Sequence, residues 1–358
     1  MRLGALVAAA ALMQVATSSD GRSVRAHGTL QPAPVIESRD GRLVATLRVE
    51  VARRTVAHGV SFVTRTYNGS VPGPTFVVRP GDNVSITLIN VLEENRPFPG
   101  SDAPAGTARG ANTTNLHIHG IFDSPQHDNT FVAVDPGARR TWHYSVDPRY
   151  SSSLLWYHPH FDGSSAMQLA GGMLGAFLVA HPAHEALFAG WDTHLLLLQK
   201  LDLNRTDKDS IFHEAREAPT NLPPQLNNPA GFSGTMLLSN EQLAPRVSLR
   251  AGTPARLRLV NAIADSEGLL CLALQAGNLP PYPPHIGPRP PSASAAPTSH
   301  PAPSPSRPPS RRGAGRARAG EAAEGEGAAG CRMEVLALDG VFLDAPRTEV
   351  GGECVPAR

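Results

Sequence analysis

The chain has 358 residues, enough for two domains of ordinary size that each bury their own core. Its formal net charge is +1 and only 5% of its residues are aromatic, which argues against a nucleic-acid partner and against an acidic membrane surface. The 34 prolines and 33 glycines, together with the scarcity of long amphipathic runs, favour an all-β fold.

The N-terminus predicts a secretory signal peptide over residues 1–19. A basic start at Arg2 precedes an apolar run, Gly4 to Ala16, that is too short to span a bilayer and ends in small polar residues. The alternative is a buried N-terminal helix. Four Asn-x-Ser/Thr sequons also favour export, at Asn68, Asn83, Asn112 and Asn204. We therefore expect a secreted, extracellular glycoprotein with no membrane-spanning segment after the signal.

Short β-rich segments separated by turns follow through residues 28–183, which we predict to form the first domain. The turns are clusters of Asn, Gly and Pro at 67–74 and 79–82. Apolar and polar residues alternate over 84–90, as in a strand with one buried face. Further strands are expected at Leu43–Val49, Thr75–Val78, Leu154–Tyr157 and Met173–Val179. Short strands with frequent turns indicate a sandwich or a barrel.

A second domain is predicted in two parts, residues 190–276 and 331–358, on either side of a biased tract. Its strand-like segments are Thr193–Gln199, Met236–Leu238, Ala255–Asn261 and Met333–Gly340. The tract at 277–330 consists mainly of Pro, Ser, Ala, Arg, Gly and Glu. Such a composition buries too little apolar area to offset the entropy of ordering, so we expect this insertion to be disordered.

The cysteines are Cys271, Cys331 and Cys354. An odd number in a secreted chain allows one disulfide and one remaining thiol, and it suggests an incomplete chain. The sequence leaves the pairing open.

Two His-x-His pairs carry the chemistry of the first domain: His117 with His119, and His158 with His160. On a strand, residues i and i+2 face the same side, about 6.5–7 Å apart along the backbone. Each pair can therefore present two imidazoles to one metal ion or one imidazole to each of two adjacent ions. Imidazole binds copper, zinc, iron and nickel, so a zinc hydrolase competes at this point, as do polar histidines at a sheet rim.

Several ordered motifs resemble the multicopper oxidases of the laccase type. They are Tyr67–Thr75 with Arg79–Asp82, the first histidine pair with Gly120, Asp128-Asn129 with Val134–Gly137, and Trp156–Val179 with Gly171-Gly172-Met173. The second domain is similar to the family's middle domain more loosely, at 256–261 and 337–340. The resemblance implies tandem cupredoxin-like Greek-key β-sandwiches, with the biased insertion in the second.

The resemblance also implies roles for individual residues. His117 would be a ligand of the type 2 copper, and His119, His158 and His160 would be ligands of the type 3 copper pair. Asp128 would match a carboxylate that feeds protons towards bound dioxygen, and its alternative is an ordinary turn residue. Five other histidines, expected to be surface or capping residues, are His127, His143, His181, His184 and His194.

The family's electron entry point is not found in these 358 residues. A type 1 copper needs one Cys and two His with a weak axial ligand, and none of the three cysteines here has a histidine beside it. The third domain, with the other trinuclear ligands, is likewise expected to be missing, and the biased tract at 277–330 and the abrupt end of the chain would both fit a faulty gene model. The family reaction oxidises phenols or metal ions and reduces dioxygen to water. We expect this chain alone to be inactive. The alternative to an oxidase is a secreted copper-binding protein without turnover. A partner chain is a further possible source of the missing copper ligands. The reducing substrate stays open.

Overall fold

The computed structural model describes residues 29–57, 60–95, 110–202, 235–243, 245–250, 253–263, 270–272, 333–338, 341–349 and 353–355. The predicted signal peptide (1–19) and the predicted disordered tract (277–330) lie outside these ranges. No helix in the described part of the chain is long and apolar enough to span a membrane.

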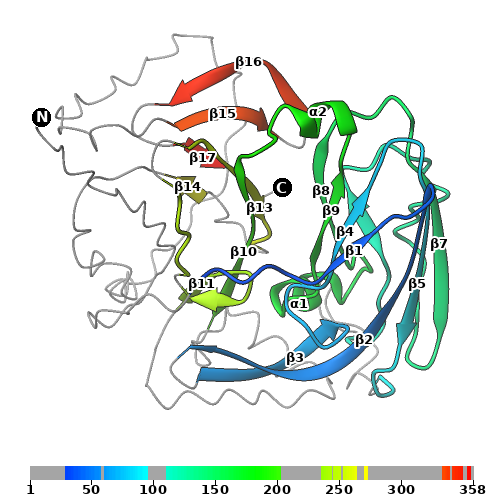
Figure 1. Ribbon diagram of the computed structural model, residues 1–358. Helices are drawn as coiled ribbons and strands as arrows, with labels where there is room; N and C mark the ends of the chain where they lie inside the picture. Colours follow the sequence, from blue (N-terminus) through cyan, green and yellow to red (C-terminus); the bar gives the residue numbers. More distant parts are fainter. Residues whose placement is uncertain are drawn as a thin grey trace, which may run out of the picture.

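The all-β prediction is confirmed, because strands make up nearly all of the regular structure (Figure 1). The first nine strands are β1 (Val35–Glu37), β2 (Arg42–Ala57), β3 (Val60–Tyr67), β4 (Thr75–Val78), β5 (Asn83–Asn90), β6 (His117–His119), β7 (Arg139–Ser145), β8 (Ser153–His158) and β9 (Gly175–Val179). The later strands are β10 (Asp192–Asp202), β11 (Thr235–Ser239), β12 (Gln242–Leu243), β13 (Ala255–Asn261), β14 (Leu270–Leu272), β15 (Met333–Leu338), β16 (Val341–Glu349) and β17 (Glu353–Val355). Two short helices, α1 (Ser165–Ala170) and α2 (Pro182–Ala186), were not predicted, since six and five residues are too few to show a helical period.

The first unit is a sandwich of two sheets. One sheet has the order β3-β2-β5-β7 and the other has the order β1-β4-β9-β8-β6. Strand β5 shows why they stack: Val84, Ile86 and Leu88 are buried, while the residues between them are more exposed. The alternation predicted over 84–90 therefore places one face of β5 in the core.

The core between the two sheets is aromatic as well as aliphatic. Phe76, Tyr157 and Phe177 form a chain of ring contacts, with centroids 5.0 Å apart for Phe76 and Tyr157 and 6.4 Å apart for Phe76 and Phe177. The opposite sheet contributes Trp142 and Tyr144 of β7, each 2% exposed. This core fixes how the histidine-bearing strands β6 and β8 lie relative to β7.

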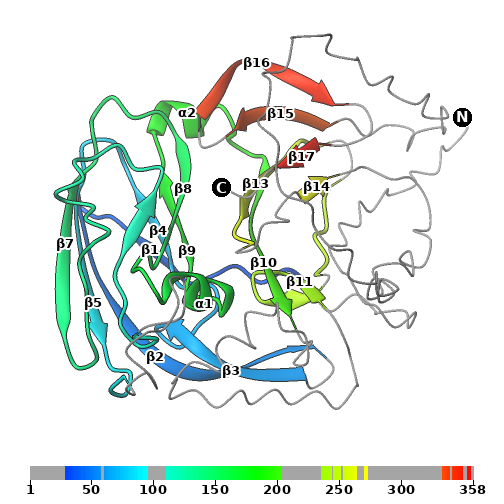
Figure 2. The same ribbon diagram turned by 180° about the vertical axis from the view of Figure 1, so that it is seen from behind.

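A second unit packs against the first. Its main sheet has the order β12-β11-β10-β13, and β10, β11 and β13 are labelled in Figures 1 and 2. Leu174 and Ala176 of the first unit share a buried apolar cluster with Leu197, Val260 and Ala262 of the second. Strand pairs β15–β16 and β14–β17 are also present, the latter with Cys271 opposite Cys354 in the backbone register.

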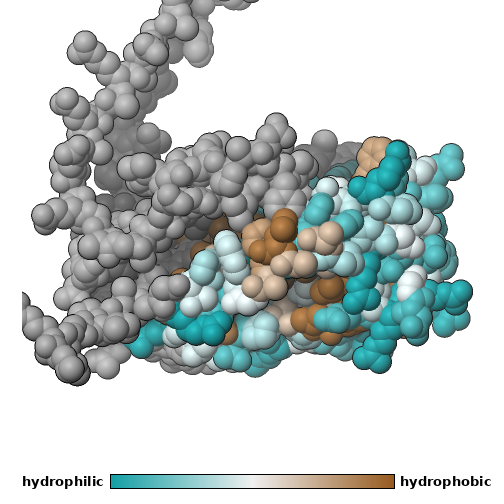
Figure 3. Space-filling model, turned by 45° about the horizontal axis from the view of Figure 1, so that its top comes forward, coloured by the Kyte–Doolittle hydropathy of each residue, from teal (hydrophilic) through white to brown (hydrophobic). Residues whose placement is uncertain are grey.

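Two polar links add to the apolar contact between the units. The backbone N–H of Leu30 donates to the carbonyl of Arg246 over 2.8 Å, so the start of the described chain lies along the second unit. Arg54 of β2 donates through Nε to Glu241 over 2.6 Å. Among the coloured residues on the face seen in Figure 3, hydrophilic ones predominate and most of the hydrophobic ones lie near the centre.

Candidate metal centre

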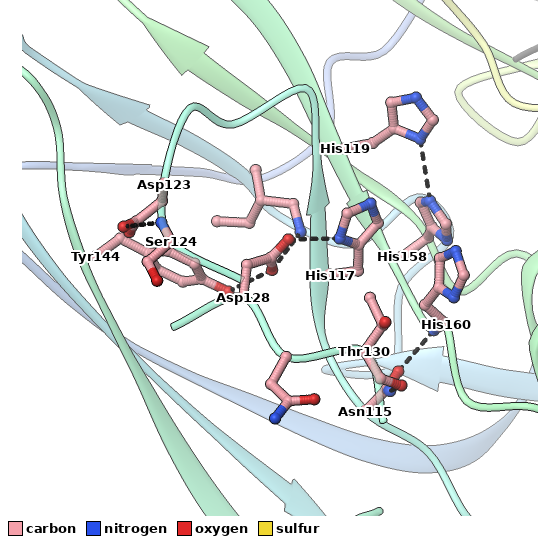
Figure 4. Close-up of polar contacts among 12 residues, drawn as sticks. Asn115, His117, His119, Asp123, Ser124, Asp128, Thr130, Tyr144, His158 and His160 are labelled. Atoms are coloured by element: carbon pink, nitrogen blue, oxygen red, sulfur yellow. Dashed lines mark hydrogen bonds and ion pairs between the residues drawn. The ribbon is translucent and has the colours of Figure 1, made fainter. Parts of the chain in front are cut away.

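The four histidines of the two His-x-His pairs lie together at one edge of the first unit. Strands β6 and β8 are antiparallel neighbours, with His117 opposite His158 and His119 opposite Trp156. The ring centroids of His117 lie 5.3 Å from His158 and 5.1 Å from His160, and those of His119 and His158 are 5.7 Å apart. The potential ligand atoms of His117, His119 and His158 all lie within 4.8 Å of one another. The rings of the two pairs thus converge on one place (Figure 4).

Asp128 orients His117. Its Oδ2 lies 2.6 Å from Nδ1 of His117, and its Oδ1 accepts from the backbone N–H of Ile118 over 3.2 Å and from the hydroxyl of Tyr144 over 3.1 Å. Because an ionised carboxylate only accepts, Nδ1 of His117 carries the proton, and its Nε2 lone pair is left for a metal. A carboxylate–histidine pair of this kind fixes the tautomer and ring orientation of metal-ligating histidines.

His158 is held in the same way by the backbone. Its Nδ1 donates to the carbonyl of Pro159 over 2.9 Å, which turns Nε2 towards Nδ1 of His119 at 3.5 Å. Burial, helped by the neighbouring imidazoles and opposed by the Pro159 hydrogen bond, lowers the pKa of His158 from its usual 6.5 to about 3. The ring is therefore neutral near pH 7, the form in which imidazole binds metal ions.

Asn115 connects the two loops that flank the site. It is fully buried; its Oδ1 accepts from the backbone N–H of His160 over 2.6 Å, and its Nδ2 donates to the carbonyl of Thr130 over 2.8 Å. Asn115 was not among the site residues predicted from the sequence. The tight amide geometry explains why an Asn stands there.

Trp156 packs beside the site. Its ring stacks on His158 with centroids 4.3 Å apart and on His119 with centroids 5.2 Å apart. Tyr157, on the opposite face of β8, points into the core and donates its hydroxyl to the carbonyl of Pro74 over 2.7 Å. Because side chains alternate between the two faces of β8, Trp156 lies on the same face as the histidines and covers one side of the site.

The other histidines with described positions lie outside the cluster. His127 contacts Asp123 over 2.8 Å, and His143 contacts Ser85 over 2.8 Å on an exposed face. His181 accepts from the backbone N–H of Ala183 at the start of α2, so it is a capping residue. Its ring stacks on that of His184, with centroids 4.3 Å apart.

The residues present fit copper. Neutral imidazoles are suitable copper ligands, and Asp128 and the Pro159 carbonyl supply an acceptor for Nδ1 of His117 and of His158. The same nitrogen donors also suit zinc, so the donor set alone does not select the metal.

The comparison with known families makes that selection. Residues 48–98 and 108–184 match the family model described as multicopper oxidase. The chain carries a domain of the multicopper oxidase family. The family resemblance predicted from the motifs is therefore confirmed, and the cofactor that the family implies is copper.

Relatives and solved structures agree with this multicopper oxidase domain. "Laccase-1" of Botryotinia fuckeliana is 28% identical over 217 residues, which cover 59% of this chain and 33% of that protein. "Multicopper oxidase mco" of Staphylococcus aureus is 25% identical over 244 residues, which cover 65% of this chain and 47% of that protein. The chain thus spans between a third and a half of the length of these relatives.

The crystal structure of McoA multicopper oxidase from Aquifex aeolicus is similar in fold. It matches 93% of this chain and 56% of its own, with a TM-score of 0.56 and 16% identity. At that identity the match bears on the fold alone, and it agrees with cupredoxin-like sandwiches.

Proposed function

We propose that this chain forms part of a laccase-like multicopper oxidase, which oxidises phenols or metal ions in one-electron steps and reduces dioxygen to water. The observation that carries the proposal is the convergence of four imidazoles from β6, β8 and the residue after Pro159. The family match over the same residues supports copper rather than zinc as the metal.

In this proposal His117 is the type 2 ligand, and His119, His158 and His160 are type 3 ligands. Copper, when bound, supplies one-electron transfer and a place for dioxygen to react. The chain's own residues hold the ligands: Asp128 keeps the proton on Nδ1 of His117, and the carbonyl of Pro159 does so for His158. Asp128 is also the carboxylate nearest to this ring, so it is our candidate for feeding protons towards dioxygen.

The remaining trinuclear ligands and the type 1 copper have to come from elsewhere. No cysteine of the printed sequence has a histidine beside it, and the chain holds two His-x-His pairs. We propose that a longer product of the gene supplies them; a partner chain is the second source. The alternative function, copper binding without turnover, rests on the same observation.

Copper titration of the purified 358-residue chain tests the site. We expect copper to bind in preference to zinc when both are offered, and His117→Ala and His158→Ala to lose that binding. His143→Ala is the matched control, since His143 lies on β7, outside the histidine cluster, and its ring forms a hydrogen bond with Ser85. Copper retention that is equal in His158→Ala and in wild type would remove the basis of the proposal.

Oxidase activity separates the two functions. The chain alone should show no blue type 1 absorption and should not oxidise a phenolic dye, because it holds no His-Cys-His segment. A longer transcript that encodes such a segment, and whose product oxidises the dye, supports the oxidase. A complete transcript without the segment would support the alternative function, copper binding without oxidase activity.

We also propose that the protein is secreted and glycosylated. Of the described sequons, Asn83 is exposed and its amide nitrogen has no partner among the described residues. Asn112 is 3% exposed, and its Nδ2 donates to the carbonyl of Glu93 over 2.8 Å, which leaves no room for a glycan. Peptide mapping of protein secreted from a eukaryotic host should find glycan on Asn83 and none on Asn112.

A further inference from the structure

Tyr144 reaches the candidate metal centre from the opposite sheet. It lies on β7, at the edge of the sheet β3-β2-β5-β7, whereas the histidine pairs come from β6 and from the end of β8. The side chain of Tyr144 is buried among the core residues, and its hydroxyl donates to Oδ1 of Asp128 over 3.1 Å. Figure 4 shows the phenol beside Asp128, on the side away from His117.

The hydroxyl has no packing reason to be there. Position 144 faces the core, where Phe would fill the same space, and a buried hydroxyl costs free energy unless it forms a hydrogen bond. The comparison within the same core is Tyr67, which is fully buried and whose hydroxyl has no hydrogen-bond partner among the described residues. Tyr144, in contrast, donates its hydrogen bond to Asp128, the carboxylate that contacts His117.

That hydrogen bond fixes the direction of the carboxylate. Oδ1 of Asp128 accepts from two donors, the hydroxyl of Tyr144 and the backbone N–H of Ile118, and Oδ2 is then left for Nδ1 of His117. Without Tyr144, the backbone N–H of Ile118 on β6 would be the one donor left to Oδ1 among the described residues. Tyr144 therefore ties the orientation of His117 to the rigid core of the opposite sheet.

We propose that Tyr144 is a positioning residue of the metal centre. It acts through Asp128 to aim Nε2 of His117 at the metal ion, and this inference rests on the proposed copper-binding function. Loss of the hydroxyl should leave the core filled and free the carboxylate to turn, so that His117 becomes a less well-directed ligand. Outer-shell partners of metal-ligating histidines typically change metal affinity about 10- to 100-fold.

The test is copper binding by the full chain with Tyr144→Phe, and with Tyr67→Phe as the matched control in the same core. We expect Tyr144→Phe to weaken copper affinity about 10-fold, the lower end of the range observed when a group that supports a metal-ligating histidine is removed. Its Cu(II) electron paramagnetic resonance spectrum should also shift, since the direction of one imidazole changes. Tyr67→Phe should leave both the affinity and the spectrum as in wild type.

A double-mutant cycle with Asp128→Ala identifies the route. In the Asp128→Ala background, Tyr144→Phe should cause no further loss of affinity, because the group through which it acts is gone. Wild-type affinity and spectrum in Tyr144→Phe, or an undiminished effect without Asp128, would overturn the inference while the proposed function stands. Failure of the wild-type chain to bind copper would overturn both.

Discussion

At the scale of single residues, the candidate site depends as much on buried polar side chains as on the histidines. Asn115 has no exposed surface, yet both ends of its amide are hydrogen-bonded, to the backbone of His160 and to that of Thr130. A buried amide that lost these partners would be costly, so the two loops are held together through this one side chain.

Replacement of Asn115 by Ala tests that link. We expect Asn115→Ala to lower the free energy of unfolding by about 1–3 kcal/mol, because the N–H of His160 is left without its acceptor. Copper affinity should fall as well, since His160 is no longer held beside His117. Asn129→Ala is the control: the Oδ1 of Asn129 accepts from the exposed Phe131 N–H, and its loss should leave copper binding unchanged. Wild-type copper affinity in Asn115→Ala would contradict this role.

The residues with clear motifs were the easiest to find from the sequence. The spacing of the two His-x-His pairs singled out the four imidazoles that the structure brings together, and the family resemblance pointed to Asp128. Their roles as ligands and proton donor stay predictions. Tyr144 was missed because an aromatic residue in a strand is ordinarily interpreted as a residue of the hydrophobic core. Nothing local marks its hydroxyl as part of the site.

At the scale of elements, the close approach of β8 and β9 decides how the second histidine pair is presented. Gly175 begins β9 opposite Tyr157, and a Cβ built at Gly175 would lie 2.3 Å from both Cζ and the hydroxyl oxygen of that ring. Glycine is therefore required here so that the Tyr157 ring can pass over the backbone and reach Pro74.

Gly175→Ala should disturb this contact. Because the Tyr157 ring is fully buried, we expect the variant to lose about 1–3 kcal/mol of stability in urea unfolding through overpacking. Gly190→Ala serves as the comparison, because no atom lies within 4 Å of a Cβ at that position and only its positive φ of 82° opposes the change. A smaller loss in Gly175→Ala than in Gly190→Ala would show that β8 and β9 are not so close.

The strands could be predicted well from the sequence, whereas the two helices could not be predicted. The alternating segment at 84–90 became β5, and the apolar segments at 75–78 and 173–179 contain β4 and β9. Helix α1 escaped prediction because its turn is set by tertiary contacts: the hydroxyl of Ser164 donates to the carbonyl of Thr113 over 2.7 Å, and Gln168 donates to the same carbonyl over 2.8 Å. Neither contact has a signature in the local sequence.

At the scale of the whole molecule, the two units share buried apolar surface. Leu197 is completely buried between them, in a cluster with Leu174 and Ala176 of the first unit and Val260 and Ala262 of the second. A shared core of this kind couples the stability of one unit to that of the other.

Leu197→Ala tests the coupling. Removal of a buried leucine side chain costs about 2–5 kcal/mol, and because the cavity opens at the shared surface we expect the signals of both units to move together in one unfolding transition. Leu257→Ala, on the same sheet but 40% exposed, should change stability far less. Two separate transitions, with only the later one sensitive to Leu197→Ala, would show that the units fold independently.

By itself, the sequence determined the class of the fold and the chemistry of the site. Alternating strand segments indicate a sheet with one buried face, as in a sandwich or a barrel, and His-x-His spacing puts two imidazoles on one side of a strand. Only the tertiary structure decided that the two pairs meet, because His119 and His158 are 39 residues apart and their strands become neighbours through long-range register. It also decided that Tyr144 of the opposite sheet supports Asp128, since a contact across a sandwich depends on how the two sheets stack, which no local pattern encodes.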